Sequence, residues 1–530
     1  MKRERHQPSP STVARKTFGQ LLSGVDGATL LRGSEVPVHS VCFDSRKASS
    51  GALFVALRGS YSDGHDYLDA ARKNGATACV IDRDALTDSV TDYAAIAVVP
   101  DSRKALSEIA RRYYEHPSRD LKLVGITGTD GKTTTSFMVD HLLRRAGYST
   151  GLITTVATRM PGASPISAGR QTTPESLEIQ RLLFDMREAG ADVVILETSS
   201  HGLETHRVDG CVFDVGVITN ITHEHLDFHG TLEAYRRAKR RLFDFVDLAR
   251  EEGGLGVAIV NMDDPGARTA IREPSELTFR RYGILSASSC DVSAMAIEPH
   301  DGGYRFKLGV PGVIRDVDLP VVGRWNISNA LAAVSVCLAL GVSVDPIIEG
   351  LRTMPAIPGR MQSLDAGQPF NVLVDYAHTA PALEQLLQAV RETTAGSILV
   401  VFGSAGERDI EKRAEMGAVA HRCADFTLIT SEDPRFENPD AIIDAIAGGA
   451  IRAGAVEGVD FDRLEDRRTA IFEILRRAEC GDTVVLAGKG HEQSMIYGSE
   501  ARPWNESDIA LDGLRALGYS TSPSPREGHD

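Results

Sequence analysis

The chain has 530 residues, of which 42% are hydrophobic and 25% charged, and this composition predicts a water-soluble protein of three or four domains. Its formal net charge of −15 argues against nucleic acid as a partner, and no uncharged apolar run is long enough to cross a membrane. The seven cysteines form no CxxC pair, which argues against a zinc site or a disulfide framework and favours a reducing cytoplasm.

The first part of the chain predicts a tail and a small α/β domain. Residues 1–16 are basic and contain Pro and Ser, so we expect a disordered tail; a transit peptide is the alternative, which Glu4 disfavours. Residues 17–120 are expected to form an N-terminal domain with the strands VCFDSR, ALFVALRG and ATACVID. In the same domain DYLDAARKNG predicts a helix that ends at Gly75.

Short apolar runs recur from residue 121 and predict a central domain over residues 121–356. Polar loop residues follow each of the runs LKLVGIT, ADVVILE, DVGVITN and LGVAIVN, a pattern typical of buried parallel strands covered by helices. Between Cys290 and Gly323 the residues alternate around the turn Asp301-Gly302-Gly303, which predicts antiparallel hairpins attached to the sheet. The helix NISNALAAVSVCLALG closes this domain.

A linker and a second α/β series follow. Pro355 and Pro358 interrupt both helix and strand in MPAIPGR, which indicates a domain boundary. Residues 357–517 alternate strands such as FNVLVDYA, SILVVFG and TVVLAG with helices and predict a doubly wound, Rossmann-like domain. Residues 518–530 predict a second disordered tail. The predicted fold class is therefore α/β with three domains, the central one built on a P-loop-type parallel sheet with attached antiparallel hairpins.

The sharpest motif is a glycine-rich loop between the strand LKLVGIT and a helix. Glycines let backbone N–H groups curl around phosphate oxygens, the helix N-terminus adds a partial positive charge, and Lys132 neutralises the β and γ phosphates. Thr133 would offer its hydroxyl to Mg²⁺. The strict P-loop pattern has a glycine where this chain has Ile126, so a glycine turn with an incidental lysine is the alternative.

The loop sequence TGTDGKTTT resembles the ATP-binding loop of the Mur ligase family. Further resemblances follow in the family's order and cover nearly the whole chain: FDSR, DGHDY, ETSSHGLETHRV, NITHEHLDFHGTLEAYRRAK, VNMDDP, GRWNISNALAA, PGRM, VDYAHTAPAL, GSAGERD and GKGHE. Within the family, the enzymes that add the third amino acid to UDP-MurNAc-L-Ala-D-Glu are the most similar. The resemblance implies a ligase that uses ATP and Mg²⁺ to form an acyl phosphate in peptidoglycan precursor synthesis.

Four side chains are the candidate catalytic groups. Lys132 would neutralise phosphate, and Glu197, at the end of the strand ADVVILE, would bind Mg²⁺ together with Thr133. His225 resembles the family's metal-ligating histidine, although zinc binding or a hydrogen bond would suit it equally. Lys239 by itself would be a solvated surface lysine. The resemblance implies instead that CO₂ carbamylates it to N6-carboxylysine, an anion that organises the magnesium site.

The resemblance also assigns binding residues. Those expected to bind ATP are Gly128, Thr129, Asp130, Gly131, Lys132, Thr133, Thr134, Asn329, Arg360 and Asp375. Those expected to bind the uridine-linked precursor are Ser45, Arg46, His65, Thr172, Thr173, Ser199, Thr205 and Arg207, although Thr205 stands where some members have Gln. Arg360 and Asp375 would reach the nucleotide from the third domain, which makes domain closure a condition of catalysis.

The incoming amino acid is expected to contact Arg408, Asp433, Arg435, Gly488 and Glu492. Family members that add meso-2,6-diaminopimelate usually have Asp-Asn-Pro-Arg, where this chain has Glu432-Asp433-Pro434-Arg435. Arg435 favours diaminopimelate because a guanidinium pairs with the distal carboxylate in bidentate geometry. Asp433 instead favours the ammonium of lysine or ornithine, unless it pairs with Arg435. We favour diaminopimelate and keep lysine and ornithine as alternatives.

Two other functions compete with this interpretation. One is another ligase of the family, such as a folylpolyglutamate synthetase, which would not need the uridine-binding segments. The other is a nucleotide-binding module without turnover, against which the intact candidate catalytic residues argue. We expect a cytoplasmic monomer whose only partners are its small substrates, with neither nucleic acid nor membrane.

Overall fold

The computed structural model describes residues 14–59, 62–86, 92–167, 171–222, 224–272, 275–300 and 303–520. The predicted tails up to residue 13 and from residue 521, the turn residues Asp301 and Gly302, and His223 lie outside the described residues. Lys16, the last residue of the predicted N-terminal tail, pairs with Val38 between β1 (Lys16–Thr17) and β3 (Pro37–Val38), so this residue lies in a strand.

The chain folds into two compact units. The first comprises Met1–Ser293, Gly309–Gly312 and Asn329–Ile347, and the second comprises Ala294–Leu308, Val313–Ser328 and Ile348–Asp530. The predicted domain boundaries stay predictions.

A five-stranded sheet forms the N-terminal part of the first unit, in the order β2-β7-β6-β5-β4. Its strands are β2 (Thr29–Arg32), β4 (Ser40–Cys42), β5 (Ala52–Val55), β6 (Ala76–Asp82) and β7 (Ala95–Val99), and its helices include α1 (Phe18–Leu22), α2 (Leu68–Lys73) and α3 (Ser102–Tyr113). Strands β4 to β7 are parallel, and β2 is antiparallel to β7. The uninterrupted apolar runs of β5 and β7 are buried throughout, as expected of strands covered on both faces.

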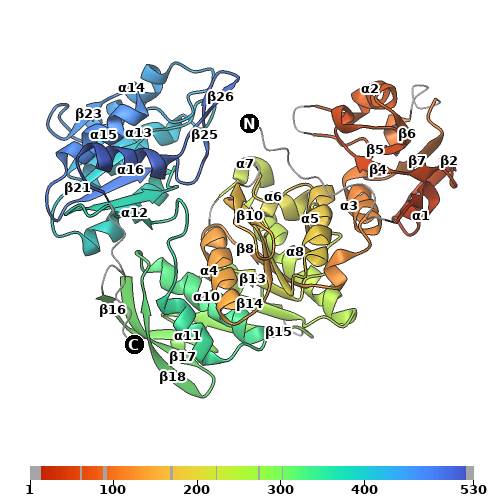
Figure 1. Ribbon diagram of the computed structural model, residues 1–530, viewed down its shortest axis with the longest axis horizontal. Coiled ribbons are helices and arrows are strands. Elements are labelled where there is room, and N and C mark those ends of the chain that lie inside the picture. The colour runs from red at the N-terminus through yellow and green to blue at the C-terminus, as the bar shows by residue number, and fades with distance from the viewer. Residues whose placement is uncertain are drawn as a thin grey trace. The chain divides into compact units, whose positions relative to one another are not determined.

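The central sheet of the first unit has β8 (Lys122–Thr127) between β12 (Val193–Glu197) and β13 (Val215–Ile218), all three parallel. The sheet also contains β9 (Thr150–Ile153), β10 (Ala157–Arg159), β11 (Ile166–Ser167), β14 (Val257–Asn261) and β15 (Thr278–Gly283). Figure 1 shows α4 (Lys132–Arg145) on one side of β8 and α5 (Ser176–Glu188) with α8 (Leu232–Glu251) on the other. Since β8, β12 and β13 are parallel, the loops after their carboxyl ends meet at one edge of the sheet.

Short connections link the remaining helices of the first unit to this sheet. They are α6 (Ser200–Glu204), α7 (Leu226–His229) and α9 (Pro265–Arg268), and the chain later returns through α10 (Trp325–Ala339) and α11 (Val344–Arg352). Strand β16 (Val292–His300) begins beside β15 and continues into the second unit.

Strands β17 (Gly303–Val310) and β18 (Val313–Leu319) lie mostly in the second unit and form a hairpin whose turn follows Val310, whereas the turn that the sequence predicts is at Asp301-Gly302-Gly303. The ion pairs Arg305–Asp318 (2.6 Å) and Lys307–Asp316 (2.9 Å) move in opposite directions along the two strands, which makes the pair antiparallel.

The C-terminal sheet has the order β19-β20-β24-β21-β22-β23 and is parallel except for the short β19. Its strands are β19 (Gln362–Ser363), β20 (Asn371–Asp375), β21 (Ile398–Phe402), β22 (Phe426–Ile429), β23 (Phe461–Arg463) and β24 (Thr483–Ala487), and β25 (Ser494–Tyr497) pairs separately with β26 (Glu500–Pro503).

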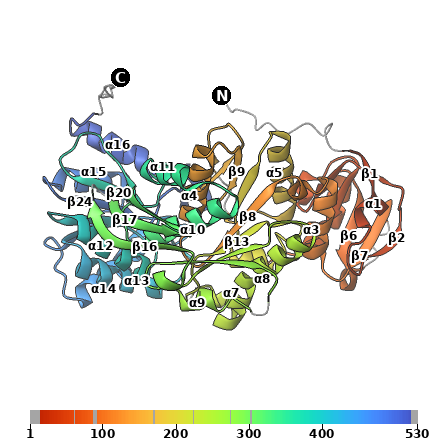
Figure 2. The same cartoon turned by 90° about the horizontal axis from the view of Figure 1, so that it is seen from below.

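Helices cover both faces of this sheet, as Figure 2 shows. On one side lie α12 (Ala380–Thr393), α13 (Glu411–Cys423) and α14 (Pro439–Arg452), and on the other lie α15 (Arg467–Arg477) and α16 (Glu506–Ala516). Leu373 and Val485 belong to the first of the two cores, and their neighbours Val372 and Val484 to the second. This alternation is the two-residue period of a strand buried on both faces. The predicted α/β fold class is confirmed.

Candidate active site

The phosphate loop lies between β8 and α4, as predicted. Gly131 has φ +80°, and a Cβ there would collide with the side-chain oxygen of Asn329, so only glycine fits. Two residues that follow β13 hold the loop backbone. The Thr219 hydroxyl donates to the Asp130 carbonyl (2.6 Å), and the Asp130 N–H donates to the Asn220 side chain (2.8 Å). These contacts hold the loop in place and already use the N–H groups of Thr129 and Asp130.

Lys132 starts helix α4, and its ammonium bends back over the loop. Its Nζ donates to the carbonyls of Gly128 (3.0 Å) and Thr129 (2.7 Å). Thr135, one turn further along, donates to Asn329 Oδ1 at 3.4 Å, so Asn329 lies against the start of the same helix. The structure therefore brings the predicted ATP residues of the loop together with Asn329.

Glu197 and Thr133 face each other across the carboxyl ends of adjacent strands. The Thr133 hydroxyl lies 3.1 Å from both carboxylate oxygens of Glu197, and Thr155 N–H donates to the same carboxylate (3.0 Å). A hydroxyl and a carboxylate are oxygen ligands that suit Mg²⁺, which takes its remaining ligands from phosphates and water. Among the described residues no group of three or more His, Cys, Asp or Glu side chains could hold a metal ion.

His225 lies in a group of aromatic rings. Its ring centroid is 4.8 Å from that of His201 and 6.3 Å from that of Tyr235, and its Nε2 lies 3.7 Å from Glu224. His225 has a φ of +55°, a strained conformation for a residue with a side chain. His201 and His229, whose rings are 5.6 Å apart, complete the group and were not singled out in the sequence.

Lys239 is buried beneath the phosphate loop, with 1% of its surface exposed. Its Nζ donates to the Gly128 carbonyl (2.5 Å) and lies 4.6 Å from the ring centre of Tyr235. Burial, reinforced by the charge of Lys132, lowers the pKa of Lys239 well below its ordinary value. The surface position that residue type alone would suggest is wrong, and the side chain is a buried amine that tends to be neutral.

Three of the predicted precursor residues meet next to Glu197. The Thr173 hydroxyl donates to the Glu197 carbonyl (3.0 Å) and lies 3.1 Å from the Ser199 hydroxyl, while Arg207 donates to the Thr173 carbonyl (2.8 Å). Glu175, which no motif in the sequence singles out, lies 3.2 Å from Arg207 and 3.4 Å from Arg103. Its place in the segment QTTPE was the only available signal.

Thr205 ends helix α6, and its hydroxyl donates to the carbonyl of His201 (2.7 Å). Thr172 lies next to Thr173 in the chain. The Thr205 hydroxyl therefore donates its proton within the helix. The longer side chain of Gln, which some family members have at this position, would extend further from the backbone.

The predicted uridine residues lie at the N-terminal sheet. Ser45 begins a 3-10 helix (Ser45–Lys47), and the exposed Arg46 forms a bidentate pair with Asp44 (2.8 and 2.9 Å), which holds the pKa of that carboxyl below its usual range. His65 accepts a hydrogen bond from Asp82 N–H (3.1 Å), so its other ring nitrogen carries the proton that faces Asp63 (2.5 Å). Both nitrogens of His65 are occupied, and the ring holds the loop in place.

In the second unit, Asp375 and Arg360 lie near each other at the end of β20. The Asp375 carboxylate accepts the N–H groups of Met361 and Ala377 (2.8 Å each), and its burial raises its pKa. Arg360 lies 4.9 Å from the ring centre of Tyr376. The Asp375 carboxylate thereby connects the segment before β20, at Met361, with the segment after it, at Ala377.

Of the predicted amino-acid residues, Asp433 and Arg435 follow β22, Gly488 and Glu492 follow β24, and Arg408 follows β21. Asp433 Oδ1 accepts Lys489 Nζ (2.8 Å) and Ile496 N–H (3.0 Å), and Lys489 also pairs with Glu492. Asp433 therefore pairs with Lys489, and the alternative pairing with Arg435 is wrong. Within the described part of the chain, neither Arg435 nor Arg408 has an ion pair, and Nε of Arg435 is buried without a hydrogen-bond partner.

Gly488 faces the buried carboxylate of Glu432. A Cβ at Gly488, where φ is +101°, would collide with Glu432 Oε2, an atom that finds no hydrogen-bond partner among the described residues. Burial raises the pKa of Glu432 to about 6. Glycine is thus required beside a carboxyl group that titrates near neutrality.

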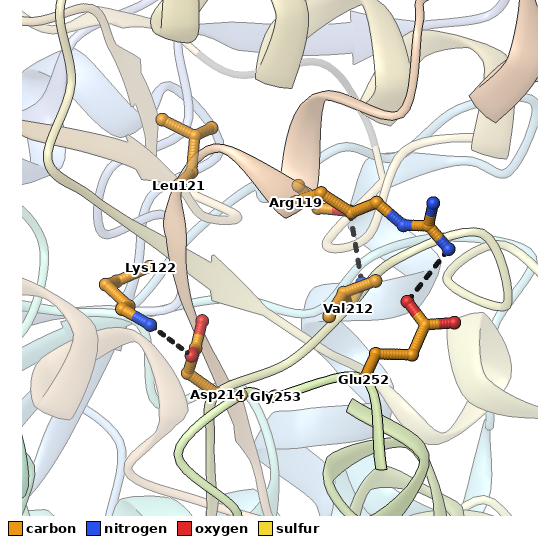
Figure 3. Close-up of a pocket in the computed structure, with 9 residues that line it drawn as sticks. Arg119, Leu121, Lys122, Val212, Asp214, Glu252 and Gly253 are labelled. Carbon is orange, nitrogen blue, oxygen red and sulfur yellow. Dashed lines mark hydrogen bonds and ion pairs between the residues drawn. The ribbon is translucent and has the colours of Figure 1, made fainter. Parts of the chain in front are cut away.

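A separate cavity of about 440 Å³ is lined by residues at the start of β8, by Val212 and Asp214 before β13, and by Glu252 after α8 (Figure 3). Its charged side chains pair with each other: Lys122 with Asp214 (2.9 Å) and Arg119 with Glu252 (2.9 Å). Since Lys122 begins β8 and the phosphate loop follows its other end, the cavity is separate from the candidate active site.

Comparisons with known proteins cover most of the chain. The families described as "Mur ligase family, catalytic domain", "Mur ligase middle domain" and "Mur ligase, glutamate ligase domain" match residues 37–114, 126–337 and 359–490. A UDP-N-acetylmuramyl-tripeptide synthetase of Roseiflexus sp. (strain RS-1) is 42% identical over 91% of this chain and 95% of its own. A UDP-N-acetylmuramoyl-L-alanyl-D-glutamate–2,6-diaminopimelate ligase of Geobacillus thermodenitrificans (strain NG80-2) is 38% identical over 93% and 98%.

Solved structures agree with these sequence matches. A structure of a UDP-N-acetylmuramoyl-L-alanyl-D-glutamate–2,6-diaminopimelate ligase is 28% identical with a TM-score of 0.67, covering 96% of this chain and all of the other. A folylpolyglutamate synthase of Mycobacterium tuberculosis, at 17% identity and a TM-score of 0.59 over 80% of this chain and 96% of its own, is similar in fold alone. In the part of the chain that the structure describes, we find no helix with the length and apolar character needed to span a membrane.

Proposed function

Because the chain belongs to the Mur ligase family, we propose that it adds meso-2,6-diaminopimelate to the D-Glu of UDP-N-acetylmuramoyl-L-alanyl-D-glutamate. The chain is an ATP-dependent acid–amino-acid ligase of the type that joins a diamino acid to this precursor in peptidoglycan synthesis. The identity of the diamino acid is the proposed part.

The observation that supports diaminopimelate is the unpaired state of Arg435. A guanidinium that has no carboxylate partner among the described residues is available for a carboxylate of the substrate, in bidentate geometry. Diaminopimelate differs from lysine by a second carboxylate, and ornithine lacks it as well. Asp433, the residue that would attract a distal ammonium, already has Lys489 as its partner.

The chemistry places two demands on the chain. The D-Glu carboxylate attacks the γ-phosphorus of ATP, ADP leaves, and the resulting acyl phosphate reacts with the amine to form the amide and release phosphate. Lys132 and the loop amides lower the charge on the phosphates. Thr173, Ser199 and Arg207 are suited to hold the precursor near Glu197, while the residues after β22 and β24 hold the amino acid.

Mg²⁺ and a modified lysine complete the proposal. Thr133 and Glu197 would supply oxygen ligands, with His225 as the predicted further ligand, and a bound Mg²⁺ neutralises phosphate charge. A neutral Lys239 amine is the form that attacks CO₂: the new N–C bond takes the nitrogen lone pair, and a proton leaves to give the carbamate. The carbamate is the anion expected to organise the metal site. We also propose a cytoplasmic monomer that acts on small substrates only.

A substrate panel tests the proposal. Purified protein with the UDP-linked dipeptide and ATP is given diaminopimelate, lysine or ornithine in turn, and phosphate release is measured. We expect release with diaminopimelate and at least tenfold less with the others, roughly the effect of one lost charged contact. A preference for lysine or ornithine would reject our choice of amino acid.

Lys132→Ala separates an enzyme from a nucleotide-binding module without turnover. We expect ATP turnover to fall by a factor on the order of 10³ because phosphate charge is no longer neutralised, while precursor binding persists. Lys307→Ala, which removes an exposed lysine of the hairpin, is the matched control and should keep turnover. If wild-type protein shows no turnover that depends on both the precursor and an amino acid, the module is the correct description.

A further inference from the structure

Lys489 carries an ammonium group that is buried inside the C-terminal domain. Its side chain is fully buried and pairs with both Asp433 (2.8 Å) and Glu492. Burial alone would lower the pKa of Lys489, but the two carboxylates outweigh it and raise the pKa, so the side chain stays charged. One buried cation thus balances two carboxylates that were expected to contact the incoming amino acid.

The segment that carries Asp433 and Arg435 has little freedom to rearrange. Arg435 N–H donates to the Ile496 carbonyl (3.0 Å), and Gly498 N–H donates to the Arg435 carbonyl (2.7 Å), which ties the segment to β25. Asp433 and Arg435 both have positive φ, of +41° and +54°. The backbone of this segment is therefore fixed by hydrogen bonds, whereas the charged side chains of Asp433 and Arg435 could still change their ion-pair partners.

We propose that Lys489 determines amino-acid specificity by neutralising Asp433 and so leaving Arg435 free for the distal carboxylate of the substrate. This inference rests on the proposed function and extends it to a residue outside the set expected to contact the amino acid. Lys489 is a positioning residue, because it acts through Asp433.

Removing the ammonium would reverse the local preference. Asp433 would become a buried anion without a cation, and the nearest ways to satisfy it are to capture Arg435 or to attract an ammonium from the substrate. The first removes the carboxylate site, and the second favours the distal ammonium of lysine. Both disfavour diaminopimelate and leave the transfer chemistry itself unchanged.

The experiment measures kcat/KM for diaminopimelate and for lysine in wild type, Lys489→Met, Asp433→Asn and the double variant. In Lys489→Met, we expect the diaminopimelate-to-lysine ratio to fall by at least about tenfold, the effect of one unsatisfied charge. In the double variant the ratio should stay within about threefold of that in Asp433→Asn, because no carboxylate is left to neutralise. Lys489→Arg, which keeps the charge, should retain most of the wild-type ratio.

Two results would overturn the inference. One is a loss of activity that is equal for both amino acids, which indicates a purely structural role. The other is the same change of ratio in the presence and absence of Asp433. If Lys489→Met does not fold, the Asp433→Asn variant alone tests the inference. Its diaminopimelate-to-lysine ratio of kcat/KM should rise or stay unchanged, and a tenfold fall in that ratio contradicts the inference.

Failure of the proposed function gives a different pattern. Wild type would then prefer lysine or ornithine in the substrate panel, whereas the coupling between positions 433 and 489 would still report whether Lys489 acts through Asp433.

Discussion

Two buried lysines, one in each compact unit, have opposite surroundings. Lys239 lies under the phosphate loop with a carbonyl and an aromatic ring as neighbours, and its pKa is lowered. Lys489 lies between two carboxylates, and its pKa is raised. Burial is nearly equal, so the partners decide the charge. A neutral amine is reactive toward CO₂, whereas a paired ammonium is inert and serves as a fixed charge.

The largest expected effect concerns the reactive lysine. Lys239→Met removes the amine, and with it the proposed carbamate, so we expect ligase activity to fall by a factor on the order of 10² to 10³, as when one preorganised charged group is lost from an active site. In ¹³C-bicarbonate, NMR should detect a carbamate signal in wild type and not in this variant. Lys307→Met is the control for general effects of losing a lysine. Full activity in Lys239→Met would contradict the proposed modification.

The stability of the two variants sharpens the comparison. Lys489→Met leaves two carboxylates without their cation and should lower the free energy of unfolding by about 3–5 kcal/mol. Lys239→Met replaces a neutral amine with an apolar chain of similar length and should change it by less than about 1.5 kcal/mol. Denaturant midpoints in CO₂-free buffer measure both changes. Equal losses would mean that the two lysines have the same charge state.

The pH dependence of stability gives the smallest effect. Because burial raises the pKa of Glu432 from 4.5 to about 6, the folded protein favours the protonated carboxyl. The contribution of Glu432 to the free energy of unfolding is therefore fully present below pH 4.5 and is lost as the pH rises through about 6. Glu432→Gln, which does not titrate, should therefore gain about 2 kcal/mol relative to wild type between pH 4 and pH 7, the free energy that corresponds to a pKa raised from 4.5 to about 6.

Thermal midpoints of wild type and Glu432→Gln across this range test the sign. Glu437→Gln is a suitable control, because Glu437 is close to Arg413 (2.9 Å) and hydrogen bonding from Arg413 lowers its pKa. That control should lose stability relative to wild type as the pH rises. A difference that runs the other way at position 432 would mean that the pKa of Glu432 in the folded state is lowered below 4.5, not raised.

Some features were missed because they carry little local signal. Strand β7 and helix α3 were not singled out, although AIAVV is a short apolar run of the expected kind. Glu175 and Lys489 look like ordinary surface charges in the sequence, and Lys239 was placed on the active site only by resemblance. Their roles depend on neighbours far apart in the chain, such as Arg103 for Glu175 and Asp433 for Lys489.

The sequence by itself determined the α/β fold class, the succession of strands and helices and the phosphate loop, because apolar periodicity and glycine spacing act between residues close together in the chain. The tertiary structure alone decided which charges are paired. It joined Thr133 to Glu197, buried Lys239 where no carboxylate among the described residues pairs with it, and paired Asp433 with Lys489 and not with Arg435. Charge states depend on burial and on contacts across the fold, and no local pattern specifies these.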